Sequence, residues 1–420
     1  MPDVDLATVD LTDLDVFAHG FPHELFTHLR REAPVWWQEP TEHTPGGEGF
    51  WNLTRHGDIL GAATDAVAFT SDGSSQRPTG GGTLIEDLPA GFAAGVLLNM
   101  MEDPRHQRIR QLVTPAVSPR ALAALEADLT LRAEAIVAEV AERVEVDFLV
   151  DVAAELPLQA IAHLLGVPQA DRHKLFSWAN ATLDYEDHDL GESSAKAQEA
   201  SAAMFEYGTW LMHEKRRCPA DDMISAVANA RIARDDGEPG RLDDLEVQMF
   251  FNLLIAAGSE TTRNSIAAGL VALVDHRDQW RALDGERALL ASGTEEILRY
   301  ASSTAYNRRT LTRDVEVRDT LLRAGTKALL WWSSANHDED VFTDPFRFDV
   351  RRHPNRHLVF GHGSHFCLGA NLARLEIKVV LAALLDRFDH IELTGPIEWT
   401  RSNKHTGIRH LPVRVHRKGT

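Results

Sequence analysis

The sequence has 420 residues, of which 44% are apolar, an ordinary share for a globular protein with a large core. Its 43 lysines and arginines are outnumbered by 63 aspartates and glutamates, which gives a net charge of -20 at neutral pH. This balance argues against a nucleic-acid partner, because the binding of phosphates requires a basic surface.

The N-terminal segment, MPDVDLATVDLTDLDVF, is acidic and lacks the basic and apolar stretches of a secretion signal. The most apolar runs elsewhere are far shorter than the roughly 20 residues that span a bilayer. The two cysteines, Cys218 and Cys367, cannot form a disulfide framework and suit a reducing compartment. We therefore expect a protein of the cytoplasm without a membrane anchor.

A region that mixes apolar pieces with turns precedes a mostly helical one. The stretch from Gly49 to Ile59 alternates enough to predict a strand, and the glycine-rich stretch from Ser71 to Thr83 predicts a loop. Ser118 and the proline after it predict an N-cap and a helix start, followed by apolar residues at helical spacing. Further helices are expected near residues 155–166, 170–183, 193–216 and 370–387, and strands at TLTRDVEV, TKALLWWSSA and LPVRVH.

The longest predicted helix extends from about Asp243 to His276 and is apolar almost all round in its middle, so it should be buried on every side. At about 1.5 Å per residue it would be roughly 50 Å long, enough to cross a large domain. The sequence therefore predicts one domain over residues 1–420, with a β-rich part at about 30–100 and a helical core at about 101–390.

One of the two cysteines lies among glycines and histidines. The segment FGHGSHFCLGANLAR places Cys367 directly before a predicted helix. From the residues alone, this thiol could be a buried structural group, a nucleophile with a positioned base, or a zinc ligand. A zinc site would lack the usual paired ends, C-x-x-C or H-x-x-x-H. Its other ligands would come from His353, His357, His362 and His365.

A fourth use is as a thiolate ligand of haem iron, because free backbone N–H groups at a helix start stabilise a thiolate. Phe360, Gly363, Cys367 and Gly369 form the pattern F-x-x-G-x-x-x-C-x-G. This pattern resembles the haem-binding loop of the cytochromes P-450 at every fixed position. The resemblance implies haem b as the cofactor, with Cys367 as the axial ligand of the iron.

The same resemblance implies a mainly α fold with small β-sheets, a triangular helical domain whose long central helix lies over the haem. The activity that it implies is that of a haem-thiolate monooxygenase, which hydroxylates a C–H bond with one oxygen atom of O2. Three other motifs in the expected order extend the resemblance over essentially the whole chain.

The second motif is AAGSETT, midway along the long predicted helix. An acid and an alcohol, Glu260 and Thr261, are costly in so apolar a helix unless they are used or satisfied. A threonine bonded back to its own helix and an ion-paired glutamate would satisfy them. The resemblance instead implies catalytic roles, with Thr261 hydrogen-bonding dioxygen or water and Glu260 gating proton delivery.

The third motif is EEILR, in which Glu296 and Arg299 stand three residues apart on one helix face and can pair. Such a pair is often an ordinary surface contact. The resemblance implies a buried structural couple that meets an arginine from a later segment, and FTDPFRF offers Arg347 for this role.

The fourth motif lies in MEDPRHQRIRQL, where His106 and Arg110 stand one turn apart on a predicted helix. Both could grip a carboxylate, although each alone could be a solvated charge. The resemblance implies that they hold a haem propionate together with His365 and Arg309.

The resemblance also implies which residues line the substrate pocket, here called the substrate wall. Apolar residues at these places are as often plain core as ligand contacts. The implied wall residues are Leu84, Ile85, Leu97, Leu98, Leu253, Ala256, Ala257, Thr304, Ala305, Tyr306 and Lys404–Thr406. The region from Tyr185 to Arg217 is expected to form a mobile lid.

The segment SANHDEDVFTDPFRFDVRRHPNRHLVFG resembles the bacterial branch that acts on sterol side chains, methyl-branched lipids and terpenoids. We therefore expect hydroxylation of a bulky, lipophilic terpenoid, steroid or branched lipid. The alternative is a tailoring oxidation of a polyketide or peptide in secondary metabolism, and a haem-thiolate sensor or electron carrier is a third possibility.

The implied partners are O2, a lipophilic small molecule, and a ferredoxin with its reductase as electron donors, and the chain is expected to be a monomer. Because ferredoxins are usually acidic, a basic patch is expected around the cysteine loop. Its candidates are Arg351, Arg352, Arg356 and Arg374.

Overall fold

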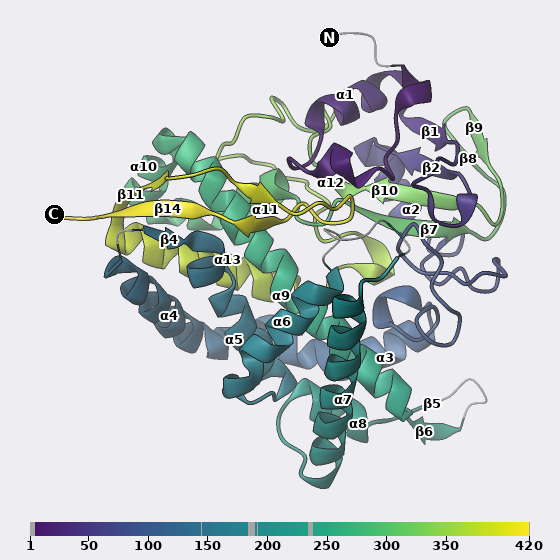
Figure 1. Ribbon diagram of the computed structural model, residues 1–420, viewed down its shortest axis with the longest axis horizontal. Coiled ribbons are helices and arrows are strands. Elements are labelled where there is room, and N and C mark those ends of the chain that lie inside the picture. The colour runs from purple at the N-terminus through teal and green to yellow at the C-terminus, as the bar shows by residue number, and fades with distance from the viewer. Residues whose placement is uncertain (1–4, 144, 184–189, 191, 234–237, 420) are drawn as a thin grey trace.

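The computed structural model describes residues 5–143, 145–183, 190, 192–233 and 238–419. Figure 1 shows a large group of helices on one side of the molecule and a smaller group of strands with α1 and α12 on the other. Long helices come from the apolar patterns of the middle of the sequence. The largest sheet joins strands from the first 70 residues to strands that lie beyond residue 305.

Most helices lie between residues 105 and 387. They are α3 (Arg105–Val113), α4 (Pro119–Ala141), α5 (Glu155–Leu165), α6 (Arg172–Leu183), α7 (Ala195–Arg217), α8 (Met223–Asn229), α9 (Asp244–Asp275), α10 (Arg277–Gly285), α11 (Leu290–Ala301) and α13 (Ala370–Arg387). The helices expected near 155–166, 170–183, 193–216 and 370–387 are thus confirmed. Ser118 caps α4, since its hydroxyl accepts a hydrogen bond from the N–H of Ala121 at 3.3 Å.

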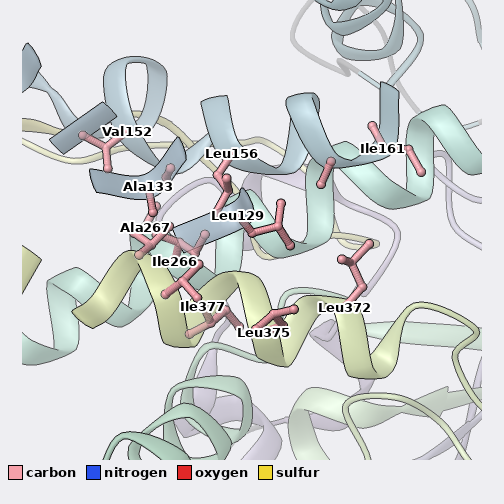
Figure 2. Packing of buried hydrophobic residues seen from close by; sticks show 14 of the residues in the cluster. Leu129, Ala133, Val152, Leu156, Ile161, Ile266, Ala267, Leu372, Leu375 and Ile377 are labelled. Atoms are coloured by element: carbon pink, nitrogen blue, oxygen red, sulfur yellow. The ribbon is translucent and has the colours of Figure 1, made fainter. Parts of the chain in front are cut away.

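Helix α9 confirms the long helix expected over residues 243–276. At its start, the Asp243 carboxylate accepts from the N–H of Glu246 at 2.9 Å, and the Glu246 carboxylate accepts from the N–H of Asp243 at 2.8 Å. Helices α5, α6, α7, α11 and α13 pack against it. Figure 2 shows side chains from α9, α4, α5 and α13 interdigitating in one hydrophobic core.

The largest sheet has five strands in the order β1-β2-β10-β7-β3. Their bounds are β1 (Val35–Gln38), β2 (Phe50–Leu53), β10 (Lys327–Trp331), β7 (Tyr306–Leu311) and β3 (Phe69–Thr70). A second hydrophobic core lies around this sheet and includes Phe26 and Trp331, whose ring centroids are 4.7 Å apart.

The remaining strands form small sheets. Strand β14 (Pro412–Arg417) lies between β11 (Phe388–Leu393) and β4 (Glu145–Asp147), and two-stranded sheets are formed by β5 (Arg231–Ala233) with β6 (Pro239–Arg241), β8 (Val315–Val317) with β9 (Thr320–Leu322), and β12 (Glu398–Trp399) with β13 (Ile408–His410). The expected strands at residues 310–317 and 411–416 are confirmed as the end of β7 with β8, and as β14.

Two strand predictions were too long. The stretch over 49–59 is a strand only as far as Leu53, because α2 (His56–Thr64) begins three residues later. The carboxylate of Asp338, 282 residues later, accepts from the N–H of His56 at 2.8 Å and satisfies the helix start. The strand expected over 326–335 ends at Trp331, where α12 (Trp332–Ala335) follows and packs against α1 (His23–Glu32) and α2.

Within the described ranges, every helix falls short of the length or apolarity that a bilayer-spanning segment needs.

Candidate functional site

The cysteine loop connects the strand-rich part to α13. Cys367 lies between a short 3-10 turn, Gly363–His365, and the first residue of α13, and its N–H donates to the carbonyl of Phe360 at 2.8 Å. Gly363 has a φ of +74°, and a Cβ there would meet the Ala63 carbonyl oxygen at 2.6 Å. Only glycine therefore allows the loop to close this tightly against α2.

Cys367 is accessible to solvent, although many protein atoms lie around its sulfur. Burial raises the pKa of the thiol, whereas the N–H of Gly369 and the charges of Arg110 and Arg374 act in the opposite direction. The free chain therefore holds a protonated thiol at neutral pH, and a metal ion bound here would displace that proton.

The middle of α9 is partly accessible. Ala257 is exposed, and Leu253 and Thr261, one turn before and after it, are half-buried, whereas Ile255 and Ser259 are buried. Leu254 and Gly258 are half-buried as well, so the accessible residues at this point are mostly small or apolar. Such a surface suits contact with a flat, apolar cofactor and a lipophilic ligand.

The acid and alcohol of this helix make the contacts that would satisfy them without a catalytic role. The Thr261 hydroxyl donates to the Ala257 carbonyl at 3.0 Å, and Glu260 lies 3.9 Å from the guanidinium of Arg263. Glu260 is buried, while Thr261 remains partly accessible. The structure therefore leaves the alcohol, but not the acid, open to solvent.

Arg263 links Glu260 to helix α6. Its guanidinium donates to the Asn180 side-chain oxygen at 2.7 Å and lies 5.2 Å from the centre of the Phe176 ring. Burial lowers the pKa of Arg263, and Glu260 opposes this shift. Glu260 acts in the same way on His405, whose pKa burial also lowers. Sequence reasoning missed this cluster, although the three-residue spacing of Glu260 and Arg263 was a usable signal.

A second buried acid lies behind the pair. Glu376 of α13 has a carboxyl oxygen with no hydrogen-bond partner, and burial raises its pKa to about 8, although a hydrogen bond from Thr262 opposes the shift. This carboxyl is therefore neutral at pH 7. Its position inside the apolar run LEIKVVLAALL was the signal in the sequence.

The four groups expected to hold propionates gather around two carboxylates. The rings of His106 and His365 are 4.5 Å apart, and His365 Nε2 lies 3.3 Å from Glu102 Oε2. Arg110 donates to the Phe366 carbonyl at 2.6 Å. Burial lowers the pKa of Arg309 to about 10, and Glu102 opposes that shift.

Buried His106 tests whether an anionic group fits here. Its Nδ1 lies 3.1 Å from Asp103 Oδ1, whereas its Nε2 is buried without a partner. An acceptor such as a propionate oxygen would satisfy that atom. The cations and the accessible thiol of the neighbouring loop therefore fit a haem with its two carboxylates.

The residues predicted for the substrate wall fall into a buried group and an accessible group. Ile85, Leu98, Ala305 and Tyr306 are buried in the two hydrophobic cores, so their accessibility does not support direct contact with a ligand. The half-buried or exposed members are Leu84, Leu97, Leu253, Ala256, Ala257, Thr304, His405 and Thr406.

Lys404 joins three of the predicted wall segments. Its Nζ donates to the carbonyls of Tyr306 at 2.7 Å and Thr83 at 3.2 Å, and lies 4.5 Å from the Tyr306 ring centre. Burial lowers the pKa of Lys404 to about 7. The lysine is therefore engaged by the protein itself.

The predicted lid over Tyr185–Arg217 is described in part, because residues 184–189 and 191 lie outside the described residues. An open hollow of about 640 Å³ lies where α6, α7 and the loop of Phe92 meet. Thr182, Ala197 and Phe205 line it together with Phe92.

Glu296 and Arg299 are fully buried, and two hydrogen bonds of 2.8 Å join them. The prediction of Arg347 as the third group is wrong about the side chain. The Arg352 guanidinium reaches both Glu296 oxygens at 3.1 Å, while Arg347 supplies its backbone carbonyl, which accepts from Arg352 at 2.8 Å and from Arg299 at 3.4 Å. Arg347 and Arg352 lie in the same irregular segment after α12, so sequence spacing alone could not show which of the two side chains reaches Glu296.

The zinc alternative gains no support from the described residues. His357 lies 3.1 Å from Glu295, and His365 faces Glu102. In the part of the chain that is described, a group of potential metal ligands close enough to share an ion occurs at His390, Glu392 and His416, and none includes Cys367.

The expected basic patch is smaller than predicted. Arg352 belongs to the buried Glu296 network, and Arg374 pairs with Glu295 at 2.6 Å. Arg351 pairs with Glu286 at 3.2 Å on the surface, and Arg356 is exposed.

The family described as Cytochrome P450 has a sequence model that matches residues 135–412 of this chain. The chain belongs to the cytochrome P450 family. Cytochrome P450 126 of Mycobacterium tuberculosis is 47% identical over 411 residues, which cover 98% of both proteins. This chain is accordingly a P450 monooxygenase with haem b as its cofactor, and the expected fold class is confirmed.

Other relatives carry names that state a substrate. The steroid C26-monooxygenase of Rhodococcus jostii is 38% identical, over 96% of this chain and 84% of its own length. The methyl-branched lipid omega-hydroxylase of Mycobacterium tuberculosis is 38% identical, over 98% and 96%. A Mycobacterium marinum P450 solved in complex with pseudoionone has a TM-score of 0.88 at 33% identity and covers 99% of this chain and 100% of its own.

Proposed function

We propose that this P450 hydroxylates the methyl-branched, apolar end of a bulky lipophilic molecule such as a terpenoid, a steroid or a branched lipid. The observation that carries the proposal is the accessible face at the middle of α9, where Leu253, Ala256 and Ala257 offer no polar side chain to a ligand. Small residues at this point leave room for a branched end rather than for a polar group.

The names of the relatives support the same substrate class. A sterol side chain, a methyl-branched lipid and pseudoionone all carry methyl branches on an apolar chain. A tailoring reaction on a polar polyketide or peptide would require donors that are free to meet it. Lys404 of the predicted wall donates instead to protein carbonyls.

Cys367, Arg110, His106, His365 and Arg309 are the residues that we propose to hold the cofactor. Bound there, the haem supplies the oxidising chemistry that activates O2. The orphan Nε2 of His106 and the enclosed guanidinium of Arg309 suit propionate oxygens. The N–H of Gly369 would stabilise the sulfur as a thiolate.

We propose Thr261 and Glu260 as the residues that hold and move protons. The Thr261 hydroxyl is partly accessible and donates to its own helix, so its oxygen can still accept a hydrogen bond from water or a bound ligand. Buried Glu260 would need to exchange its Arg263 contact for contact with Thr261 or with water. Because Arg263 also binds Asn180 of α6, movement of α6 would change the position of this carboxylate.

Electrons are proposed to come from a ferredoxin with its reductase, at a location in the cytoplasm. Arg351 and Arg356 near the cysteine loop remain candidates for a weak, salt-sensitive contact with an acidic partner.

The substrate class can be tested by titrating the purified haem-loaded protein with matched lipids. The shift of the haem spin state on titration gives the dissociation constant. We expect a methyl-branched fatty acid or isoprenoid to bind at least about tenfold more tightly than the straight-chain isomer, a difference in binding free energy of ~1.4 kcal/mol. Product analysis should then place the hydroxyl on the branched end. Equal binding of both isomers, or turnover of polar polyketides alone, would contradict the proposal.

A Thr261→Ala variant is expected to separate electron consumption from product formation. Without the hydroxyl, proton delivery fails and electrons are lost as hydrogen peroxide, so hydroxylation should fall by about 10²-fold while the Michaelis constant stays close to that of the wild type. Product and peroxide are measured per reduced cofactor consumed. Thr261→Ser keeps the hydroxyl and should restore coupling, and unchanged coupling in Thr261→Ala would remove this residue from its proposed role.

A further inference from the structure

We propose that β11 and β14 carry a binding site for a divalent transition-metal ion, with His390, Glu392 and His416 as its ligands. This site is separate from the haem site and from the proposed function. Figure 1 shows the two strands beside α10, on the opposite side of the molecule from β1 and β9.

Strand register brings the three side chains together. His390 of β11 is the direct cross-strand partner of His416 of β14, and their rings stack with centroids 4.0 Å apart and an interplanar angle of 9°. Glu392 stands two residues after His390 and so lies on the same face of the strand. Its Oε1 is 3.3 Å from His416 Nε2.

The spacing of these atoms is close to what an ion requires. One ligand atom from each residue lies within 4.8 Å of the other two. In a tetrahedral zinc site with bonds of about 2 Å, ligand atoms are about 3.3 Å apart, so the two rings must rotate out of their stacked arrangement to bring the ligand atoms closer together. The side chains of His390, Glu392 and His416 are 29%, 37% and 36% exposed, which leaves an entry path and room for water as a fourth ligand.

Two further contacts favour ligation. His416 Nε2 is buried and faces the Glu392 carboxylate at 3.3 Å without a well-formed hydrogen bond, and a metal ion between the two groups would satisfy its lone pair. His390 Nδ1 lies 2.9 Å from Asp389 Oδ2, so a proton on Nδ1 donates to that carboxylate and leaves Nε2 as an acceptor. A carboxylate behind a histidine in this manner orients the ring and raises its basicity.

Arg414 is the competitor for the same position. Its guanidinium donates to Glu392 at 3.1 Å and to Glu145 at 2.6 Å. An ion that takes Glu392 therefore leaves Arg414 with Glu145 as its partner. Two imidazoles and one carboxylate select Zn²⁺, Co²⁺ or Ni²⁺ over Mg²⁺ and Ca²⁺, which prefer oxygen ligands.

The test uses the haem-loaded full chain, treated with a chelator and returned to chelator-free buffer. Calorimetric titration with Zn²⁺ should show one site per chain, and Mg²⁺ should not compete. His416→Ala and His390→Ala should each weaken binding at least about tenfold, and Asp389→Ala by about tenfold. Zn²⁺ should also raise the thermal midpoint of the wild type, because the ion joins β11 to β14.

Two controls separate a built site from adventitious binding. His19→Ala removes an exposed histidine elsewhere and should leave the titration unchanged. Arg414→Gln removes the competitor and should tighten binding. Retained Zn²⁺ affinity in the His390→Ala, His416→Ala double variant, or binding in the millimolar range only, would overturn the proposal, provided that an unchanged carbon monoxide spectrum shows that the variants are folded.

Discussion

A Cys367→Ser variant is expected to lose the haem-thiolate spectrum and the monooxygenase activity together. The backbone N–H of Cys367 donates to the Phe360 carbonyl, which fixes the residue in the loop, and the N–H of Gly369 lies close to its sulfur. A serine hydroxyl can occupy that place, but it stays protonated at neutral pH and donates far less electron density to iron. The measurement is the spectrum of the reduced protein with carbon monoxide, recorded together with product formation.

The second cysteine supplies a matched control. Cys218 follows α7 and is exposed, so Cys218→Ser should keep the spectrum and the activity of the wild type. Cys367→His should bind the cofactor with a histidine-like spectrum and without turnover. If Cys367→Ser retained both the thiolate spectrum and turnover, another ligand would hold the iron, and the proposed site would be wrong.

Local patterns in the sequence were sufficient for the parts of the site that depend on neighbours in the chain. The glycines of the cysteine loop, the capping box at Asp243 and the apolar run of α9 each specify a conformation through residues a few positions apart. The same is true of His106 and Arg110, which share one turn of α3. These elements lie where the patterns predicted them.

Contacts between distant segments could not be read in this way. The start of α2 depends on Asp338, and the third member of the Glu296 network is Arg352 rather than Arg347. In both cases a long loop brings one of several similar residues close to its partner. The spacing of neighbouring residues in the sequence does not show which residue this is. The union of Arg263 with Asn180 of α6 is of the same kind.

These long-range contacts also change the meaning of the acid and alcohol motif. From the sequence, Glu260 and Thr261 read as one functional pair. In the structure they face different surroundings, since Thr261 is partly accessible while the Glu260 carboxylate is buried against Arg263. Proton delivery by Glu260, as proposed, would therefore require a rearrangement, and Arg263 connects this carboxylate to Asn180 and Phe176 of α6.

Glu296→Ala is expected to cause the largest loss of stability among single substitutions outside the haem ligand. Glu296 is fully buried and is the shared acceptor of Arg299, Arg352 and Asn355. Its removal leaves the guanidinium of Arg299 buried without a counter-charge, which typically costs about 3–5 kcal/mol. Denaturant unfolding of the haem-loaded protein, followed by tryptophan fluorescence, measures the free energy of unfolding.

Loss of the cofactor should accompany this loss of stability. The hydrogen bond from Asn355 to Glu296 fixes the chain five residues before Phe360, so its removal loosens the approach to the cysteine loop. Glu286→Ala is the control, because Glu286 pairs with Arg351 on the surface and should change the free energy by less than about 1 kcal/mol. An equally small effect for Glu296→Ala, with full haem retention, would mean that backbone carbonyls alone satisfy both arginines: those of Asn336, Pro345 and Arg347 for Arg299, and those of Thr343, Asp344 and Arg347 for Arg352.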